Sequence, residues 1–329
     1  MRRFSIMLLL CFALLLTGCG QKSEQEVLQD LAERKQEMNT YQSRGKMVIQ
    51  TGKEPITYDV EVWYKKPYFY RVAVKNVQKD ITQVLLRNHD GVYVLTPHLK
   101  KSFRFQSNWP ESDGQVYLYQ TLIKSILRDK SRKFRTSKHD YQFDVSVALP
   151  QHPSRSKQRI WLDHDLNPKR VQVLNDEHQV MIEVTFQQFQ NRTSFDVDSF
   201  DMKRNMQQIG TEGDPKSAAD AVAPAYLPAG SRLESERSLS SLNGPLTVMR
   251  YQGKHPFAIT VRRTDTLHQE IAGNAVPINL QQALGVLTTK GKERSLSWIY
   301  QGNEYELLGK LSAAEMVKIA NTTFQEPTK

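Results

Sequence analysis

The fold class of this chain is decided by residues 57–71, TYDVEVWYKKPYFYR. Tyr58, Val60 and Val62 alternate with polar neighbours, a period of two that is typical of a strand with one buried face. Lys66-Pro67 then marks a turn, after which aromatic and β-branched residues resume. The stretch therefore predicts two β-strands joined by a short turn.

The same alternation recurs up to residue 190, and turn signals separate its short runs. Two helical patterns accompany the runs: residues 24–38, opened by the capping box Ser23 to Glu26, and residues 116–128. This order predicts a mainly β fold (β-rich α+β), in which a curved antiparallel sheet forms an incomplete barrel with a helical lid. The further runs lie at 44–50, 82–87, 92–96, 101–106, 141–147, 159–163, 170–174 and 180–190.

A change of composition at residues 206–225 predicts a linker, because glycines, prolines and a run of small residues gather there. The linker divides a first domain, 19–205, from a small α+β domain, 226–329. A second capping box, Ser312 to Glu315, predicts a closing helix through Met316–Ala320. In this domain we expect strands at 246–252, 257–263, 285–289, 295–301 and 304–309.

The N-terminus carries the parts of an export signal: two arginines, an apolar stretch at 7–16, and small residues before Cys19. Residues 1–18 are therefore predicted to be a signal peptide. Leu16-Thr17-Gly18-Cys19 is similar to a bacterial lipobox, which implies cleavage before Cys19 and lipidation of its thiol by diacylglycerol, with palmitate among the chains. An ordinary secretory signal with an incidental cysteine is the alternative. On the first interpretation, a lipid anchor holds the mature chain at the extracytoplasmic face of the cell membrane.

Composition excludes several kinds of site. Cys11 is lost with the signal and Cys19 is the predicted lipid site, so we expect no disulfide and no cysteine-based metal centre. Removing Arg2 and Arg3 with the signal takes two charges from the formal net charge of +10 and leaves +8. Such an excess attracts anionic lipid headgroups or an anionic cell wall, although a solvated surface is the plainer interpretation. Export argues against a nucleic-acid partner, and no pattern indicates a cofactor.

Several segments of the first domain share order and spacing with a known family. They are Val62–Arg71, Asp90–Pro97, Trp161–Asp163, Pro168–Arg170, Asp176 and Val184–Phe189. Together they resemble the LolA-type lipoprotein-carrier family, and the whole chain resembles the LolA-like sporulation lipoproteins of endospore-forming bacteria. Residues 298–305 and 311–316 resemble a small domain of unknown function on Gram-positive lipoproteins. The resemblance implies an incomplete barrel that holds acyl chains beneath helices.

The resemblance also implies candidate pocket or lid residues on the inner face of the sheet and on the 116–128 helix, with an ordinary core as the alternative. These residues are Tyr58, Val60, Val62, Leu118, Leu122 and Ile126. The carrier family has an arginine before its turn proline, which is thought to pin the lid. Lys66 stands at that position and is a candidate for lid gating, although lysine lacks the planar fork of a guanidinium.

No catalytic constellation is expected, and Asp163-His164-Asp165 fits a hairpin turn better than a metal cluster. The preferred function is a membrane-anchored, non-enzymatic lipoprotein that binds a lipid or a lipoprotein acyl chain in envelope or spore assembly. Its ligand would be a lipoprotein or a phospholipid. One alternative is a scaffold that binds an envelope protein partner in sporulation or germination without a lipid pocket. The other is an envelope hydrolase. A concave face filled by the protein's own side chains would count against the first function.

Overall fold

The computed structural model describes residues 22–50, 54–110, 115–148, 155–207, 222–241, 244–263 and 268–324. The predicted signal peptide and Cys19 lie outside these ranges, as does most of the predicted linker. No helix in the described ranges is long and apolar enough to cross a membrane.

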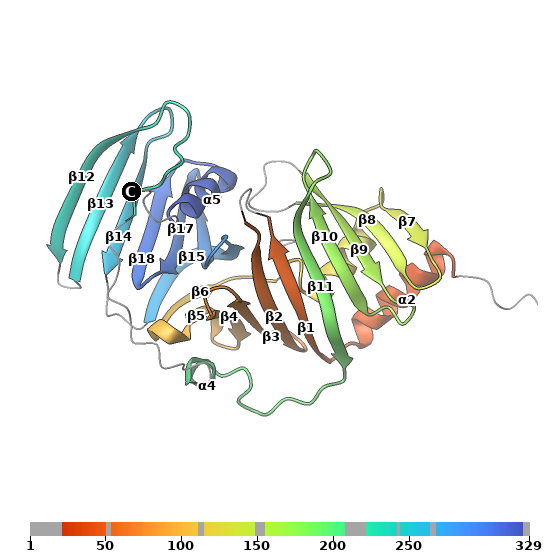
Figure 1. The fold of residues 1–329 in the computed structure, drawn as a ribbon. Helices are drawn as coiled ribbons and strands as arrows, with labels where there is room; N and C mark the ends of the chain where they lie inside the picture. Colours follow the sequence, from red (N-terminus) through yellow and green to blue (C-terminus); the bar gives the residue numbers. More distant parts are fainter. Residues whose placement is uncertain are drawn as a thin grey trace, which may run out of the picture.

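The first sheet is antiparallel and strongly curved, and its strands lie in the order β7-β8-β9-β10-β11-β1-β2-β3-β4-β5-β6 (Figure 1). β6 and β7 do not pair, so the sheet stays open, and the predicted mainly β fold with an incomplete barrel is confirmed. Its strands are β1 (Thr40–Ile49), β2 (Ile56–Lys65), β3 (Phe69–Asn76), β4 (Ile81–Asn88), β5 (Gly91–Thr96), β6 (Lys101–Gln106), β7 (Lys133–Thr136), β8 (Tyr141–Ala148), β9 (Arg155–Leu162), β10 (Pro168–Leu174) and β11 (Val180–Asn191), with a 3₁₀ turn, η2 (Pro97–Leu99), after β5.

Two helices pack against the concave side of this sheet. α2 (Glu24–Glu37) begins at the predicted capping box, in which Ser23 and Glu26 bond reciprocally, and it buries Val27 and Leu31. α3 (Tyr119–Arg128) begins three residues later than predicted. The residues before it form a tight turn, in which the Leu118 amide donates to the Gln115 carbonyl at 3.2 Å.

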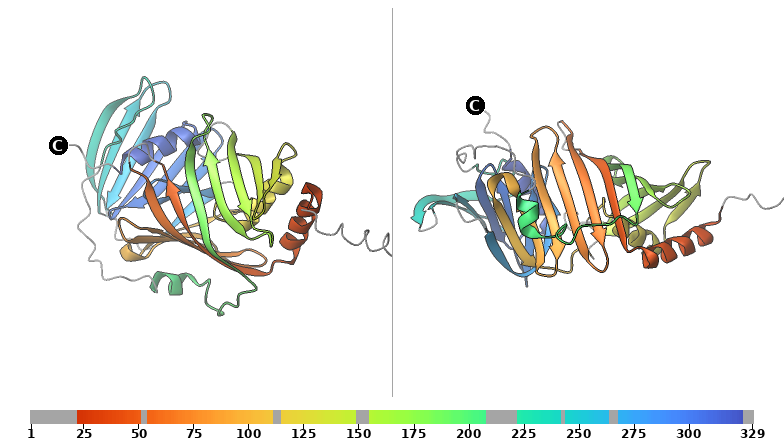
Figure 2. Two further views of the ribbon diagram at one scale, coloured as in Figure 1. Left: turned by 45° about the vertical axis from the view of Figure 1, so that its right-hand side comes forward. Right: turned by 90° about the horizontal axis from the view of Figure 1, so that it is seen from below.

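A strap follows β11 and crosses the convex side of the sheet, ending in the short helix α4 (Met202–Gln207) (Figures 1 and 2). Phe200 is buried in a separate apolar cluster with Leu86 and Leu95 of the sheet, and Phe195 and Met202 pack against it. The sequence did not predict this strap, because its few apolar residues show no regular period.

The second sheet has the order β12-β13-β14-β18-β17-β16-β15, and all its neighbours are antiparallel. α5 (Ala313–Thr322) starts at the predicted capping box and packs Met316 and Ile319 into one core with Trp298. The predicted strands are present, and β12 and β15 are two that the sequence did not predict. The strands are β12 (Arg232–Ser241), β13 (Gly244–Gln252), β14 (Phe257–Arg263), β15 (His268–Asn279), β16 (Leu284–Lys290), β17 (Glu293–Tyr300) and β18 (Asn303–Gly309).

β15 joins the two sheets. Its first part pairs in parallel with β6, so that His268 lies opposite Ser102. Its last part pairs antiparallel with β16, where Asn279 lies opposite Leu284. The second unit therefore continues the hydrogen-bonded edge of the first sheet (Figure 1).

Candidate functional site

The six candidate pocket or lid residues come together on the concave side of the first sheet, and all are buried. Leu118, Leu122 and Ile126 are 0% exposed, and the three residues of β2, Tyr58, Val60 and Val62, are at most 5% exposed. All six belong to one continuous apolar cluster. The concave face is therefore filled by the protein's own side chains at this position.

The second unit covers the other end of the concave face of the first sheet. Leu284 and Val286 of β16, Ile299 of β17 and Ala275 of β15 belong to the same apolar cluster as the first sheet's core. Burial of a leucine or isoleucine side chain contributes about 1.5–3 kcal/mol. The contact is thus a shared core and not a loose association of two domains.

Polar side chains fix the register of this contact. Gln83 of β4 accepts a hydrogen bond from the Leu284 amide at 2.7 Å, and its own amide donates to the Thr96 hydroxyl at 3.0 Å. Lys79 Nζ donates to the Tyr300 hydroxyl at 2.7 Å, and the Tyr58 hydroxyl donates to the Gln281 carbonyl. Every one of these bonds joins residues that are more than 200 positions apart, except the bond within the first sheet.

A cleft remains at the junction, beside the filled core. It encloses about 590 Å³, including its open mouth, and Tyr58 is the one predicted pocket residue that lines it. The apolar part of its wall comes from both units: Met47, Ile49, Val74, Ile81, Leu280 and Leu284. Lys79 and His98 supply charged or polar groups to the same wall. The cleft can accept a narrow apolar group next to a cation.

Burial shifts the pKa values of two titratable groups near the junction, His98 and Glu304. Burial lowers the pKa of His98, whose ring lines the cleft. Burial raises the pKa of Glu304, which Arg262 opposes from 3.7 Å, but Glu304 does not line the cleft. Of these two groups, only His98 faces the cleft.

Lys66 lies beside a helix, as its predicted gating role requires, but the helix is α2 and not α3. Its Nζ donates to the Gln36 carbonyl in the last turn of α2 at 3.1 Å, and its amide donates to the Asn39 carbonyl at 2.7 Å. A cation at the carboxyl end of a helix is favourably placed. Lys66 is exposed, so the bond adds little to stability.

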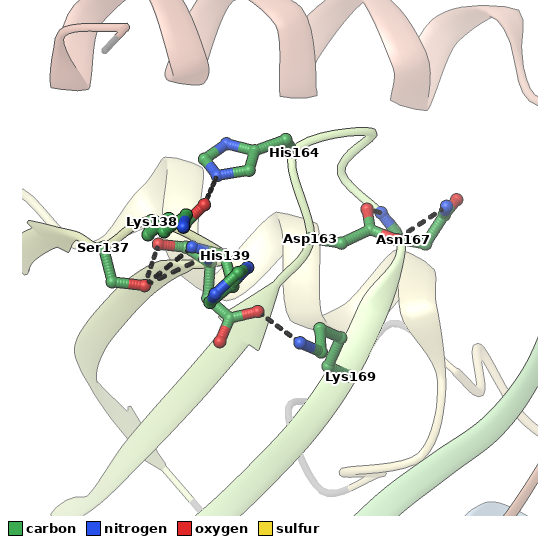
Figure 3. Close-up of polar contacts among 8 residues, drawn as sticks. Ser137, Lys138, His139, Asp163, His164, Asn167 and Lys169 are labelled. Atoms are coloured by element: carbon green, nitrogen blue, oxygen red, sulfur yellow. Dashed lines mark hydrogen bonds and ion pairs between the residues drawn. The ribbon is translucent and has the colours of Figure 1, made fainter.

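The acidic and histidine cluster at Asp163–Asp165 forms the turn between β9 and β10, as predicted (Figure 3). The Asp163 carboxylate accepts from the Asn167 amide at 2.7 Å, while His164 Nε2 contacts the Lys138 carbonyl at 3.2 Å. The two side chains thus serve different loops. In the described ranges no three His, Cys, Asp or Glu side chains are grouped to hold a metal ion.

The convex side holds a buried ion pair that the sequence did not single out. Arg71 Nε donates to Asn205 Oδ1 of α4 at 2.6 Å, and its Nη1 donates to Glu61 Oε2 at 2.9 Å. The guanidinium also lies 4.3 Å from the centre of the Trp63 ring. These contacts hold the strap against the sheet. The sequence signals them only by a charged residue, Arg71, within a predicted strand.

The sequence of this chain is similar to those of known sporulation proteins. The family model of sporulation protein YdcC-like matches residues 1–200. The sporulation protein YdcC of Bacillus subtilis (strain 168) is 36% identical over 324 residues, which cover 96% of this chain and 95% of that protein. The family match lies in the first unit, whereas the Bacillus relative spans both units.

Solved structures match this chain at low identity and low TM-score. The complex of MucA and MucB from Pseudomonas aeruginosa matches with a TM-score of 0.34 and 14% identity, over 90% of this chain and 98% of that chain. The LolA superfamily protein NE2245 from Nitrosomonas europaea matches with a TM-score of 0.31 and 11% identity, over 54% of this chain and 97% of that chain.

Proposed function

The chain belongs to the sporulation protein YdcC-like family, and from this premise we propose that it is a non-enzymatic scaffold lipoprotein of spore formation. Cys19 carries its diacylglycerol anchor, and the folded part works on the extracytoplasmic face of the membrane. Its ligand is an envelope protein, which binds to the outer surface of the joined sheets.

The observation that carries this proposal is the filled concave face. An acyl chain bound there would have to displace Leu118, Leu122 and Ile126, which are fully buried. Separating them from the sheet would expose several large apolar side chains, at about 1.5–3 kcal/mol each. A rigid, filled half-barrel instead supports a constant outer surface, as a scaffold requires.

A second candidate, binding of a lipid or lipoprotein acyl chain, is favoured by the junction cleft. Met47, Ile49 and Val74 form an apolar wall there, and Lys79 stands beside it. An alkyl chain with an anionic headgroup matches this chemistry, since each buried CH₂ contributes about 0.8 kcal/mol.

Native mass spectrometry of the mature chain with Cys19→Ala, purified from sporulating cells, tests the two candidates. A mass without lipid, together with one protein cross-linked to the full-length chain in cells, is expected for a scaffold. A co-purifying lipid that disappears in Ala283→Phe, a change that fills the cleft, would overturn the scaffold in favour of the acyl-chain binder.

Ala258→Phe is the matched control, because Ala258 lies on β14 and outside the cleft. It should change neither lipid content nor cross-linking. The lipid anchor is tested separately. The intact mass of the wild-type chain extracted from membranes should show an acylated Cys19. Cys19→Ala should release the chain from the membrane fraction.

A further inference from the structure

A basic patch covers the convex face of β7–β10, on the half of the first sheet that the strap does not cross. Directly opposed residues of antiparallel strands point to the same face, so Arg135, Trp161 and Arg170 lie in one row across the strands. Lys133 and Arg159 lie in the next row, on either side of Asp144, and Lys157 follows on β9. We define the basic patch as Lys133, Arg135, Lys157, Arg159 and Arg170 around Trp161.

The patch has an aromatic centre and an excess of positive charge. The Arg170 guanidinium lies 3.9 Å from the centre of the Trp161 ring, and that of Arg159 lies 5.9 Å from it. Asp144 is held by Arg135 and Arg159, each at 2.9 Å. Burial acts to raise the pKa of Asp144, but these hydrogen bonds outweigh it and lower the pKa, so this carboxylate stays ionised and balances one of the five cations.

An acidic helix, α2, lies on the opposite side of the same strands. α2 packs there through Val27 and Leu31, which share a core with Phe143 of β8 and Leu162 of β9. Residues 22–37 contain five carboxylates against three cations. α2 is therefore acidic, whereas α3 on the same side carries Lys124 and Arg128, so the contrast in charge lies between the basic patch and α2.

The chain outside the described residues limits the distance to the lipid. Cys19 precedes Lys22 by three residues, which span at most about 11 Å when fully extended. Arg132, the residue before β7, lies 2.8 Å from Glu24 at the start of α2, an ion pair held by charge without an aligned hydrogen bond. A lipid on Cys19 therefore brings the β7 edge of the patch close to the bilayer.

We propose that the basic patch is the membrane-facing surface of the anchored protein and binds anionic lipid headgroups. This inference rests on the proposed function, because the anchor at Cys19 places the patch. An anionic bilayer attracts the patch and repels the acidic side of α2, so the molecule lies with its convex β7–β10 face on the membrane. Trp161 suits an interface because its ring is apolar and its N–H is polar. The second unit, at the other end of the molecule, is then held away from the bilayer (Figure 2).

Binding of the mature Cys19→Ala chain to lipid vesicles tests the patch without the anchor. We expect binding to vesicles of phosphatidylglycerol and phosphatidylcholine at about 50 mM salt, release at about 0.5 M salt, and no binding to phosphatidylcholine alone. The triple variant Lys133→Gln, Lys157→Gln, Arg170→Gln should lower the partition coefficient on the order of 100-fold. Circular dichroism of the variant verifies that it folds.

The control removes the same charge from the other end of the molecule. Lys290→Gln, Lys292→Gln, Lys310→Gln changes three exposed lysines of the second unit and should leave the partition coefficient within about threefold. Equal loss in both triple variants would mean that net charge alone binds the vesicles, and it would overturn the patch. Absence of binding at low salt would overturn it too.

A position-specific probe gives a second, independent readout. The mature Cys19→Ala chain has no cysteine, so one can be introduced in the exposed part of β7 by Thr136→Cys and labelled with a polarity-sensitive fluorophore. Its emission should shift to the blue on anionic vesicles, whereas a label at Thr289→Cys in β16 should not respond. A blue shift of the label at Thr289→Cys alone would mean that the membrane contacts the second unit and not the basic patch, and it would overturn the proposal. Failure of the proposed lipid anchor can be told apart from failure of the basic patch, because a missing lipid would be detected in the mass of the full-length chain.

Discussion

The two faces of the first sheet are built in different ways. The concave face is closed by aliphatic and aromatic contacts, in which Leu122 of α3 and Val286 of β16 share one core. The convex face carries charges, and its covering strap is held by Arg71 and Glu61 as well as by Phe200. Apolar burial is non-directional and tolerates little volume change, whereas the ion pair depends on its geometry and on pH.

This difference bears on function. A filled apolar face contributes stability and leaves no room for a ligand beside Leu118, Leu122 and Ile126, whereas the outer surface stays accessible. The outer surface is where partly exposed charges, such as Arg170 and Arg135, meet the surroundings. Three measurements separate the two faces.

The largest effect is expected on the concave side. Leu122→Ala removes a fully buried side chain and should lower the free energy of unfolding by about 3 kcal/mol. The same substitution at Leu239, which is 52% exposed on β12, should change it by less than about 0.5 kcal/mol. Urea unfolding followed by circular dichroism measures both. Equal effects would mean that α3 does not close the core.

A smaller effect is expected where the strap meets the convex face. Arg71→Ala removes the donors to Asn205 Oδ1 and Glu61 Oε2 and should cost about 2 kcal/mol, less than for a fully buried pair because Glu61 is a fifth exposed. Arg44→Ala is the control, since Arg44 binds the same Glu61 carboxylate from an exposed position and should cost at most about 1 kcal/mol. If protease cuts the strap of both variants at the same rate, Arg71 does not pin it.

The smallest effect is the response of Glu61 to acid. Burial acts to raise its pKa, but the hydrogen bond from Arg44 and the charges of Arg71 and Arg44 outweigh burial and lower the pKa below the ordinary 4.5. Ionised Glu61 therefore stabilises the folded state above pH 4.5, and this contribution is lost as pH falls through the lowered pKa. Glu61→Gln should flatten the decline of unfolding free energy in that acidic range. An unchanged slope would show that other carboxylates set it.

Elements with a local chemical signal were predicted well. The capping boxes at Ser23 and Ser312 start α2 and α5 as expected, because the bonds that satisfy the first helical amides lie within four residues. Most strands of the first sheet appear at the predicted positions, β7 being an exception, the predicted relation to sporulation proteins is confirmed at the level of the family, and the predicted mainly β fold with an open, curved sheet is confirmed. Acylation of Cys19 and the domain boundaries stay predictions.

Elements that depend on distant partners were missed. β12 lies at the edge of its sheet with few buried residues, so its sequence shows no clear apolar alternation. β15 contains Pro277 and takes its position from pairing with β6, about 165 residues away. α4 is too short to show a helical period.

The sequence by itself determined the class of fold, the turns, the starts of α2 and α5 and the apolar face of most strands. Each of these follows from interactions between neighbours in the chain or from a side-chain period of two or 3.6. The tertiary structure alone decided whether that apolar face is a pocket or a core, because the answer depends on which distant side chains occupy the same volume. Val60, Leu122 and Leu284 share one core although they lie far apart in the sequence, and no local period encodes their approach.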